Sequence, residues 1–125
     1  MTFVLIAPDQ NLNNYPMNFG SSLSATLSST QNNYSPTGLN AGINCLYLTA
    51  ASGGSVITGL SNVGFPDGWG VLIMNLSTTD IISFSHLSAS SSVGNKFSCP
   101  QGVTAYLQPL TNVIVSYKSG QWVFA

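Results

Sequence analysis

The stretch Ser22-Leu23-Ser24-Ala25-Thr26-Leu27-Ser28 alternates apolar and hydroxyl-bearing side chains with a period of two residues. Successive side chains of a β-strand point to opposite faces, so Leu23, Ala25 and Leu27 share one face and the polar residues share the other. The pattern predicts a half-buried strand. No stretch of the chain shows a sustained helical period.

Similar short apolar patterns recur about every ten residues along the chain. Gly- and Pro-containing clusters such as Pro66-Asp67-Gly68 and Pro100-Gln101-Gly102 separate them and supply the backbone angles of tight turns. This spacing predicts an all-β fold, namely a single antiparallel β-sandwich of jelly-roll-like form, or a barrel. The expected strands are Phe3–Ile6, Ser22–Ser28, Ile43–Thr49, Ser55–Leu60, Trp69–Leu76, Asp80–Leu87, Val103–Leu107, Asn112–Tyr117 and Gln121–Phe124.

Two segments carry more specific predictions. Val71-Leu72-Ile73-Met74 is apolar at every position, which is typical of a central strand covered on both faces. Ser119-Gly120 is predicted to form the two-residue turn of a hairpin. We expect residues 20–125 to form one β-sandwich domain, and residues 1–19 to form an arm over a neighbour or an edge strand.

Charge is scarce in this sequence. Only 4% of the residues are charged, Arg and Glu are absent, and the formal net charge is −1. Binding to nucleic acid or to a membrane surface through basic residues needs several Lys or Arg side chains, so we predict neither partner. A neutral surface gives little electrostatic protection against self-association and can pack against protein without desolvating charges. The composition favours a subunit of a larger assembly, with a secreted domain as the alternative.

The opening Met1–Pro8 has a short apolar run with no basic residue before it. A secretory signal requires about 7 to 15 apolar residues behind a positive start, so we expect folding in the cytoplasm. Cys45 and Cys99 are interpreted as two buried thiols, with one disulfide as the alternative. Their separation offers no zinc-binding pair.

The residues that could perform catalysis are few. His86 is the only imidazole. Asp80 shares its face in a straight strand but would lie about 20 Å away, and Ser83 and Ser85 point to the opposite face. Asp67 beside Gly68 is interpreted as an ordinary turn rather than a calcium ligand. We therefore predict no enzyme, no catalytic residues, no metal and no cofactor.

Glycan binding stays open as the alternative function, because aromatic rings can stack on sugars while Asn and Ser bind hydroxyl groups. Trp69 and Trp122 are expected in the core, and Tyr34 is the favoured loop platform. The aromatic side chains considered for a platform are Trp69, Trp122, Tyr15, Tyr34, Tyr47, Tyr106 and Tyr117.

An ordered series of elements resembles a β module that is frequent in virion proteins of tailed phages. The series begins with Thr26–Leu39 and continues through Leu46–Thr49, Ile57–Leu60, Gly70–Asn75, Ile81–His86 and Ser90–Phe97 to the closing Gly120-Gln121-Trp122. It spans about four fifths of the chain. The scarcity of charge in Ser90–Phe97 and the segment 1–19 depart from the pattern.

The resemblance implies a non-enzymatic virion β-sandwich, often trimeric. The expected function is a capsid cement or decoration protein on the exterior of a phage shell. A homotrimer would bind the major capsid protein between capsomers, with the N-terminal segment and Val71–Met74 among its contacts. The alternative is a tail-fibre or baseplate part, or a glycan- or receptor-binding module on the virion.

Overall fold

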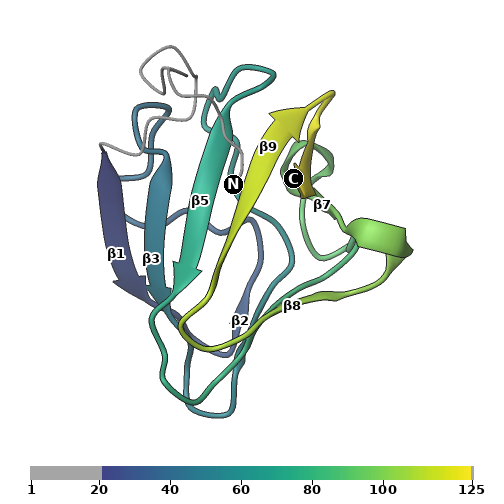
Figure 1. The fold of residues 1–125 in the computed structure, drawn as a ribbon. Coiled ribbons are helices and arrows are strands. Elements are labelled where there is room, and N and C mark those ends of the chain that lie inside the picture. Colours follow the sequence, from purple (N-terminus) through teal and green to yellow (C-terminus); the bar gives the residue numbers. More distant parts are fainter. Residues whose placement is uncertain (1–20, 125) are drawn as a thin grey trace, which may run out of the picture.

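The computed structural model describes residues 21–124, which form a β-solenoid of about four turns (Figure 1). Each coil places one strand in each of two sheets. The first coil contributes β1 (Ser22–Thr26) and β2 (Thr30–Gln31), the second β3 (Cys45–Thr49) and β4 (Ser55–Ile57), and the third β5 (Gly70–Asn75) and β6 (Ile82–Phe84). The expected strand Phe3–Ile6 and the expected arm 1–19 lie outside the described residues.

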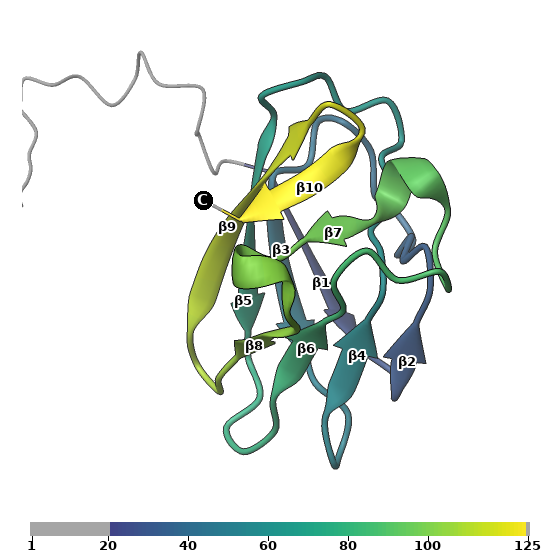
Figure 2. The same ribbon diagram turned by 90° about the vertical axis from the view of Figure 1, so that its right-hand side faces the viewer.

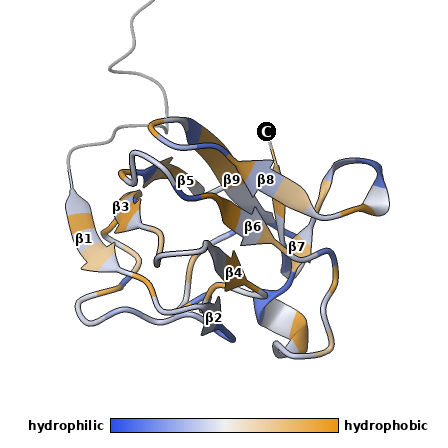
Figure 3. Cartoon of the chain, turned by 90° about the horizontal axis from the view of Figure 1, so that it is seen from below, coloured by the Kyte–Doolittle hydropathy of each residue, from blue (hydrophilic) through white to orange (hydrophobic). Residues whose placement is uncertain are grey.

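Four further strands complete the described chain. They are β7 (Phe97–Ser98), β8 (Ala105–Leu107), β9 (Asn112–Lys118) and β10 (Gln121–Phe124), with short 3-10 turns η2 (Val93–Asn95) and η3 (Pro100–Gly102). Sheet A has the strand order β1-β3-β5-β9-β10-β7, and sheet B has the order β2-β4-β6-β8. Figure 3 shows the rows β1-β3-β5-β9 and β2-β4-β6-β8 as two walls of the molecule.

The prediction of a single antiparallel sandwich or barrel, including its jelly-roll form, is wrong. Strands β1, β3 and β5 are parallel to one another, as are β2, β4 and β6. Strands that follow each other in these coils lie in different sheets, and the chain returns to the first sheet only after crossing the second. A parallel pair requires such a crossover. An alternating pattern shows which side chains share a face of a strand, but not whether the neighbouring strand runs parallel or antiparallel. For this reason the sequence pattern predicted the wrong strand arrangement.

The last strands end the parallel stacking. Strand β9 pairs antiparallel with β5, and β8 pairs antiparallel with β6. Strands β9 and β10 form the predicted hairpin, with Lys118 opposite Gln121 and positive φ angles of 54° at Ser119 and 82° at Gly120. This hairpin prediction is confirmed. Figure 2 shows β10 and β7 beside each other over this end of the solenoid.

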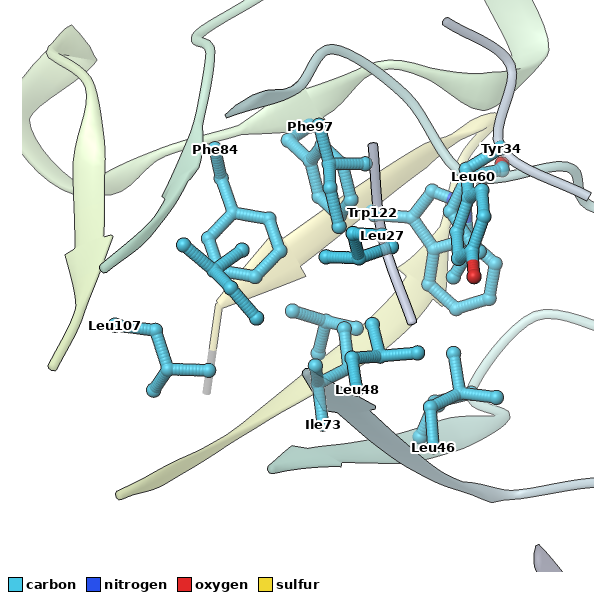
Figure 4. Close-up of a cluster of buried hydrophobic side chains, with 14 of the residues drawn as sticks. Leu27, Tyr34, Leu46, Leu48, Leu60, Ile73, Phe84, Phe97, Leu107 and Trp122 are labelled. Carbon is cyan, nitrogen blue, oxygen red and sulfur yellow. Dashed lines mark hydrogen bonds between the residues drawn. The ribbon is translucent and has the colours of Figure 1, made fainter. Parts of the chain in front are cut away.

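Apolar side chains from both sheets meet inside the coils (Figure 4). Leu23, Leu46 and Ile73 occupy equivalent positions in successive coils because their strands pair in register. Trp122 is fully buried, and its indole N–H donates a hydrogen bond of 2.8 Å to the carbonyl of Leu60. Aromatic rings of the closing strands and of β6 pack edge to face, as Phe84 and Phe97 do at 5.0 Å between ring centroids.

The segment Ser88–Gly94 is anchored to the coils by a buried hydroxyl group. Ser91 is 5% exposed, its Oγ lies 2.8 Å from that of Thr58, and it accepts a hydrogen bond of 2.8 Å from the Asn33 N–H. A β-carbon at Gly59 would come within 2.4 Å of Ser91 Oγ and 2.7 Å of the Asn95 carbonyl oxygen. Glycine is therefore required at position 59 for the loop to pack against the coils.

Candidate functional site

The residues considered for catalysis lie apart in the fold. His86 Nδ1 accepts a hydrogen bond of 3.0 Å from the backbone N–H of Cys99. The carboxylate of Asp80 accepts hydrogen bonds from the Gly53 N–H at 3.1 Å and from the Thr79 hydroxyl at 2.9 Å. Each side chain thus holds a neighbouring segment of the backbone in place, and no hydrogen bond joins the two.

Asp67 and Cys99 also have local hydrogen-bond partners. Asp67 accepts a hydrogen bond of 3.1 Å from the Ser119 N–H, which links its turn to the β9–β10 hairpin. Cys45 and Cys99 are free and buried, in agreement with their interpretation as two thiols. Burial raises the pKa of Cys99, whose thiol donates to the Phe84 carbonyl at 3.4 Å. Residues 21–124 contain no cluster of three or more His, Cys, Asp or Glu side chains able to hold a metal ion.

The structure separates the aromatic residues into core and surface. Tyr34, expected as a loop platform, is 7% exposed because its backbone bridges to Leu60 and its ring joins the core. Trp122 and Tyr117 are buried as well, whereas Trp69 is partly buried. Tyr106 is 64% exposed on β8. Tyr15 lies outside the described residues.

The outer face of sheet A carries a row of apolar side chains. Tyr47, Leu72, Met74 and Ile114 are each partly exposed, and we name them the outer patch. Leu72 on β5 is paired directly with Ile114 on β9, and Met74 is paired with Tyr47 on β3, so the residues lie on adjacent strands. Strand β5 is central, as expected, but within Val71–Met74 only the inward Val71 and Ile73 are fully covered, so the expected burial of both faces is wrong.

Most residues that flank the outer patch are uncharged, and the exception is Lys118, which ends β9 and shares this face by strand parity. Ser24, Asn112 and Ser116 share this face of the sheet by strand parity. Beneath the patch, Tyr47 interacts with Cys45, and hydrogen bonding to that thiol raises the pKa of Tyr47. The arrangement offers shape and apolar area rather than charge, which suits contact with protein.

A second surface for contact is the first coil. Among residues 21–124, β1 is one of the two edge strands of sheet A and β2 is one of the two edge strands of sheet B, so the first coil supplies one edge of each sheet. An edge strand presents unpaired N–H and C=O groups to which another strand can bind. Leu39, Ala41 and Ile43, from the connection to β3, pack partly over the core there.

No family model, curated protein or solved structure matches this chain. Within residues 21–124, no helix has the length and apolar character needed to cross a membrane.

Proposed function

We propose that this chain is a non-enzymatic structural subunit that packs against copies of itself in a larger particle. The outer patch carries this proposal. Its four side chains expose apolar area on one sheet face, in a protein whose charged residues amount to 4%. Contiguous exposed apolar surface mediates contacts between proteins, and burying it here requires no desolvation of a charge.

The particle we propose is a phage virion, and the support is the order of the sequence elements in Thr26–Trp122, since the β-sandwich that the resemblance implied is not the fold of residues 21–124. In the first placement, a homotrimer acts as a capsid cement protein on the exterior of the shell. It binds between capsomers through the major capsid protein. Because it would bind the assembled shell better than free coat subunits, it shifts the assembly equilibrium by mass action.

The second placement is a tail-fibre or baseplate part, and the free edges of β1 and β2 favour it. Among the described residues, β1 and β2 end the two sheets at the same end of the solenoid, and strands of another protein can continue such edges along the same axis. Copy number distinguishes the placements, since a cement protein is expected in hundreds per particle and a fibre or baseplate part in tens, as orders of magnitude.

The outer patch is tested by a charge placed at its centre. We expect the wild-type chain to be trimeric in light-scattering measurements and Met74→Lys to weaken self-association by about tenfold or more, equivalent to about 1.4 kcal/mol. Val93→Lys is the matched control, because Val93 is 79% exposed and lies in the turn η2, outside the outer patch. A wild-type chain that stays monomeric at high concentration would overturn the proposal.

The virion placement is tested in particles that carry the chain. Quantitative mass spectrometry gives the copy number, and heating particles prepared with and without the chain gives the lifetime of the shell. Longer lifetimes with the chain would support cement. Equal lifetimes together with a low copy number would support the fibre or baseplate placement, and absence from purified particles would contradict both.

A further inference from the structure

An open cavity of about 300 Å³ lies where the corners of the second and third coils meet the outer face of sheet B. Its lining includes Gly53, Val56, Thr79, Asp80, Ser83 and Tyr106. Val56, Ser83 and Tyr106 are paired across β4, β6 and β8, so they form one row of the sheet. The volume is at the lower end of the range for small-molecule sites, which spans about 300 to 1,000 Å³.

Tyr106 supplies an aromatic ring at one side of the cavity. It is 64% exposed, because successive side chains of β8 point to opposite faces of the sheet. The next residue, Leu107, points inward and is 5% exposed. An exposed tyrosine presents a flat apolar face together with a polar hydroxyl. Such a ring can stack on the C–H face of a sugar.

Asp80 and its turn form the polar side of the cavity. Each carboxylate oxygen of Asp80 accepts one hydrogen bond, from the Gly53 N–H or from the Thr79 hydroxyl. A carboxylate oxygen has two lone pairs, so each can accept one further hydrogen bond from a ligand hydroxyl. Ser83, between Val56 and Tyr106, adds a hydroxyl that can donate or accept.

A single buried side chain ties the two sides together. Asn75 is fully buried, and its Nδ2 donates to the carbonyl of Asp80 at 2.8 Å and to the carbonyl of Leu107 at 3.1 Å. Leu107 follows Tyr106 directly, so one amide fixes both the turn that carries Asp80 and the strand that carries the ring. A site held in place before binding loses less conformational entropy when the ligand arrives.

We propose that this cavity is a binding subsite for a neutral pyranose sugar. The sugar stacks its C–H face on Tyr106 and donates hydroxyl hydrogen bonds to Asp80. The negative carboxylate disfavours anionic ligands, and one carboxylate falls short of the six to eight oxygen ligands of a calcium site.

The proposal is tested by NMR titration of the isotope-labelled chain with maltotriose, cellotriose and chitotriose. For at least one of them, we expect saturable shifts at the amides of Gly53, Ser83 and Tyr106. Tyr106→Ala should abolish these shifts and Tyr106→Phe should retain them, since stacking needs only the ring. Asp80→Asn should weaken binding about tenfold, because an amide offers one acceptor oxygen instead of two.

Val93→Ala is the control, because Val93 is 79% exposed and belongs neither to the cavity nor to the outer patch, so it should leave sugar binding unchanged. The cavity and the outer patch share no residue, so loss of sugar binding and loss of self-association are separate outcomes. Unchanged amide spectra with all three sugars, or equal shifts in Tyr106→Ala, would overturn the proposal. The dispersion of each variant's spectrum reports whether it is folded.

Discussion

The first coil and the closing strands of this solenoid are built from similar alternating segments but differ in what covers them. On β1, the inward Leu23 and Ala25 stay partly exposed, and among residues 21–124 the strand pairs only with β3. At the other end, Trp122 is completely buried, with β10 between β9 and β7. The comparison shows that the burial of an inward side chain depends more on the position of its strand within the sheet than on the local sequence.

This difference implies an uneven distribution of stability. Free energies of local opening in a protein range from near zero up to the global value, and poorly covered segments open first. The first coil should therefore be the least protected described segment and the most available for contact with other protein. The closing strands should hold the structure together.

The largest expected effect is the loss of the indole at the closing end. Trp122→Ala should lower the free energy of unfolding by about 3–5 kcal/mol, because it removes a fully buried ring and leaves a cavity. Denaturant unfolding measures the change. Val123→Ala on the same strand is the control, since Val123 is 37% exposed and should cost far less. If the alanine variant does not fold, Trp122→Phe provides a milder version, and equal costs for the two positions would contradict the comparison.

A medium loss of stability is expected from alanine substitutions at Leu46 and Leu23, which occupy equivalent positions in neighbouring coils. Leu46→Ala should cost about 2–5 kcal/mol, since Leu46 is fully buried in the second coil. Leu23→Ala removes the same atoms from the first coil, where the side chain is partly exposed, and should cost about 1 kcal/mol. The two variants are compared by denaturant unfolding. A Leu23 cost equal to that of Leu46 would show that the first coil is as well covered as the second.

The smallest expected effect is a loss of stability in alkali. Burial raises the pKa of Cys99 above 9.0 and the pKa of Tyr34 above 10.0. The unfolded chain then loses these protons at lower pH than the folded chain, so the free energy of unfolding should fall as the pH rises above about 9. Because Tyr34 belongs to the first coil and Cys99 to the closing segment, Tyr34→Phe and Cys99→Ala should each flatten part of this decline. Stability curves of unchanged slope in both variants would refute the assignment.

The sequence predicted most strand positions because alternation is a local property. Ser22–Ser28 and Gln121–Phe124 contain strands of the structure, and Asn112–Tyr117 covers all but the last residue of β9. The two-residue strands β2 and β7 were missed, because Thr30-Gln31 and Phe97-Ser98 are too short to show a period. The pairing was wrong because strand direction depends on the path of the chain between strands. A usable signal was the recurrence of strand starts at positions 22, 45 and 70, which marks one coil.

The candidate surfaces were harder to predict than the strands. Val71–Met74 was recognised as central, but its outward Leu72 and Met74 become a patch only when β3 and β9 place Tyr47 and Ile114 beside them. Asn75 was not singled out, since an asparagine that ends an apolar strand resembles the start of a turn. Its role arises from carbonyls 5 and 32 residues further along the chain. Tyr34 was predicted to lie in an exposed loop, because the sequence does not show that its backbone bridges to Leu60 after β4 and that its ring is buried.

In this parallel solenoid, the strands must keep their register with the neighbouring coils, whereas the turns between the strands are free of that requirement. Strand pairing fixes the register of the walls, while the corners between walls, such as the turn at Gly53-Gly54, carry much of the proposed sugar cavity. Loops at the surface tolerate substitution and insertion far better than the elements they connect. Ligand preference could therefore diversify at the corners of this protein while the same coils continue to fold.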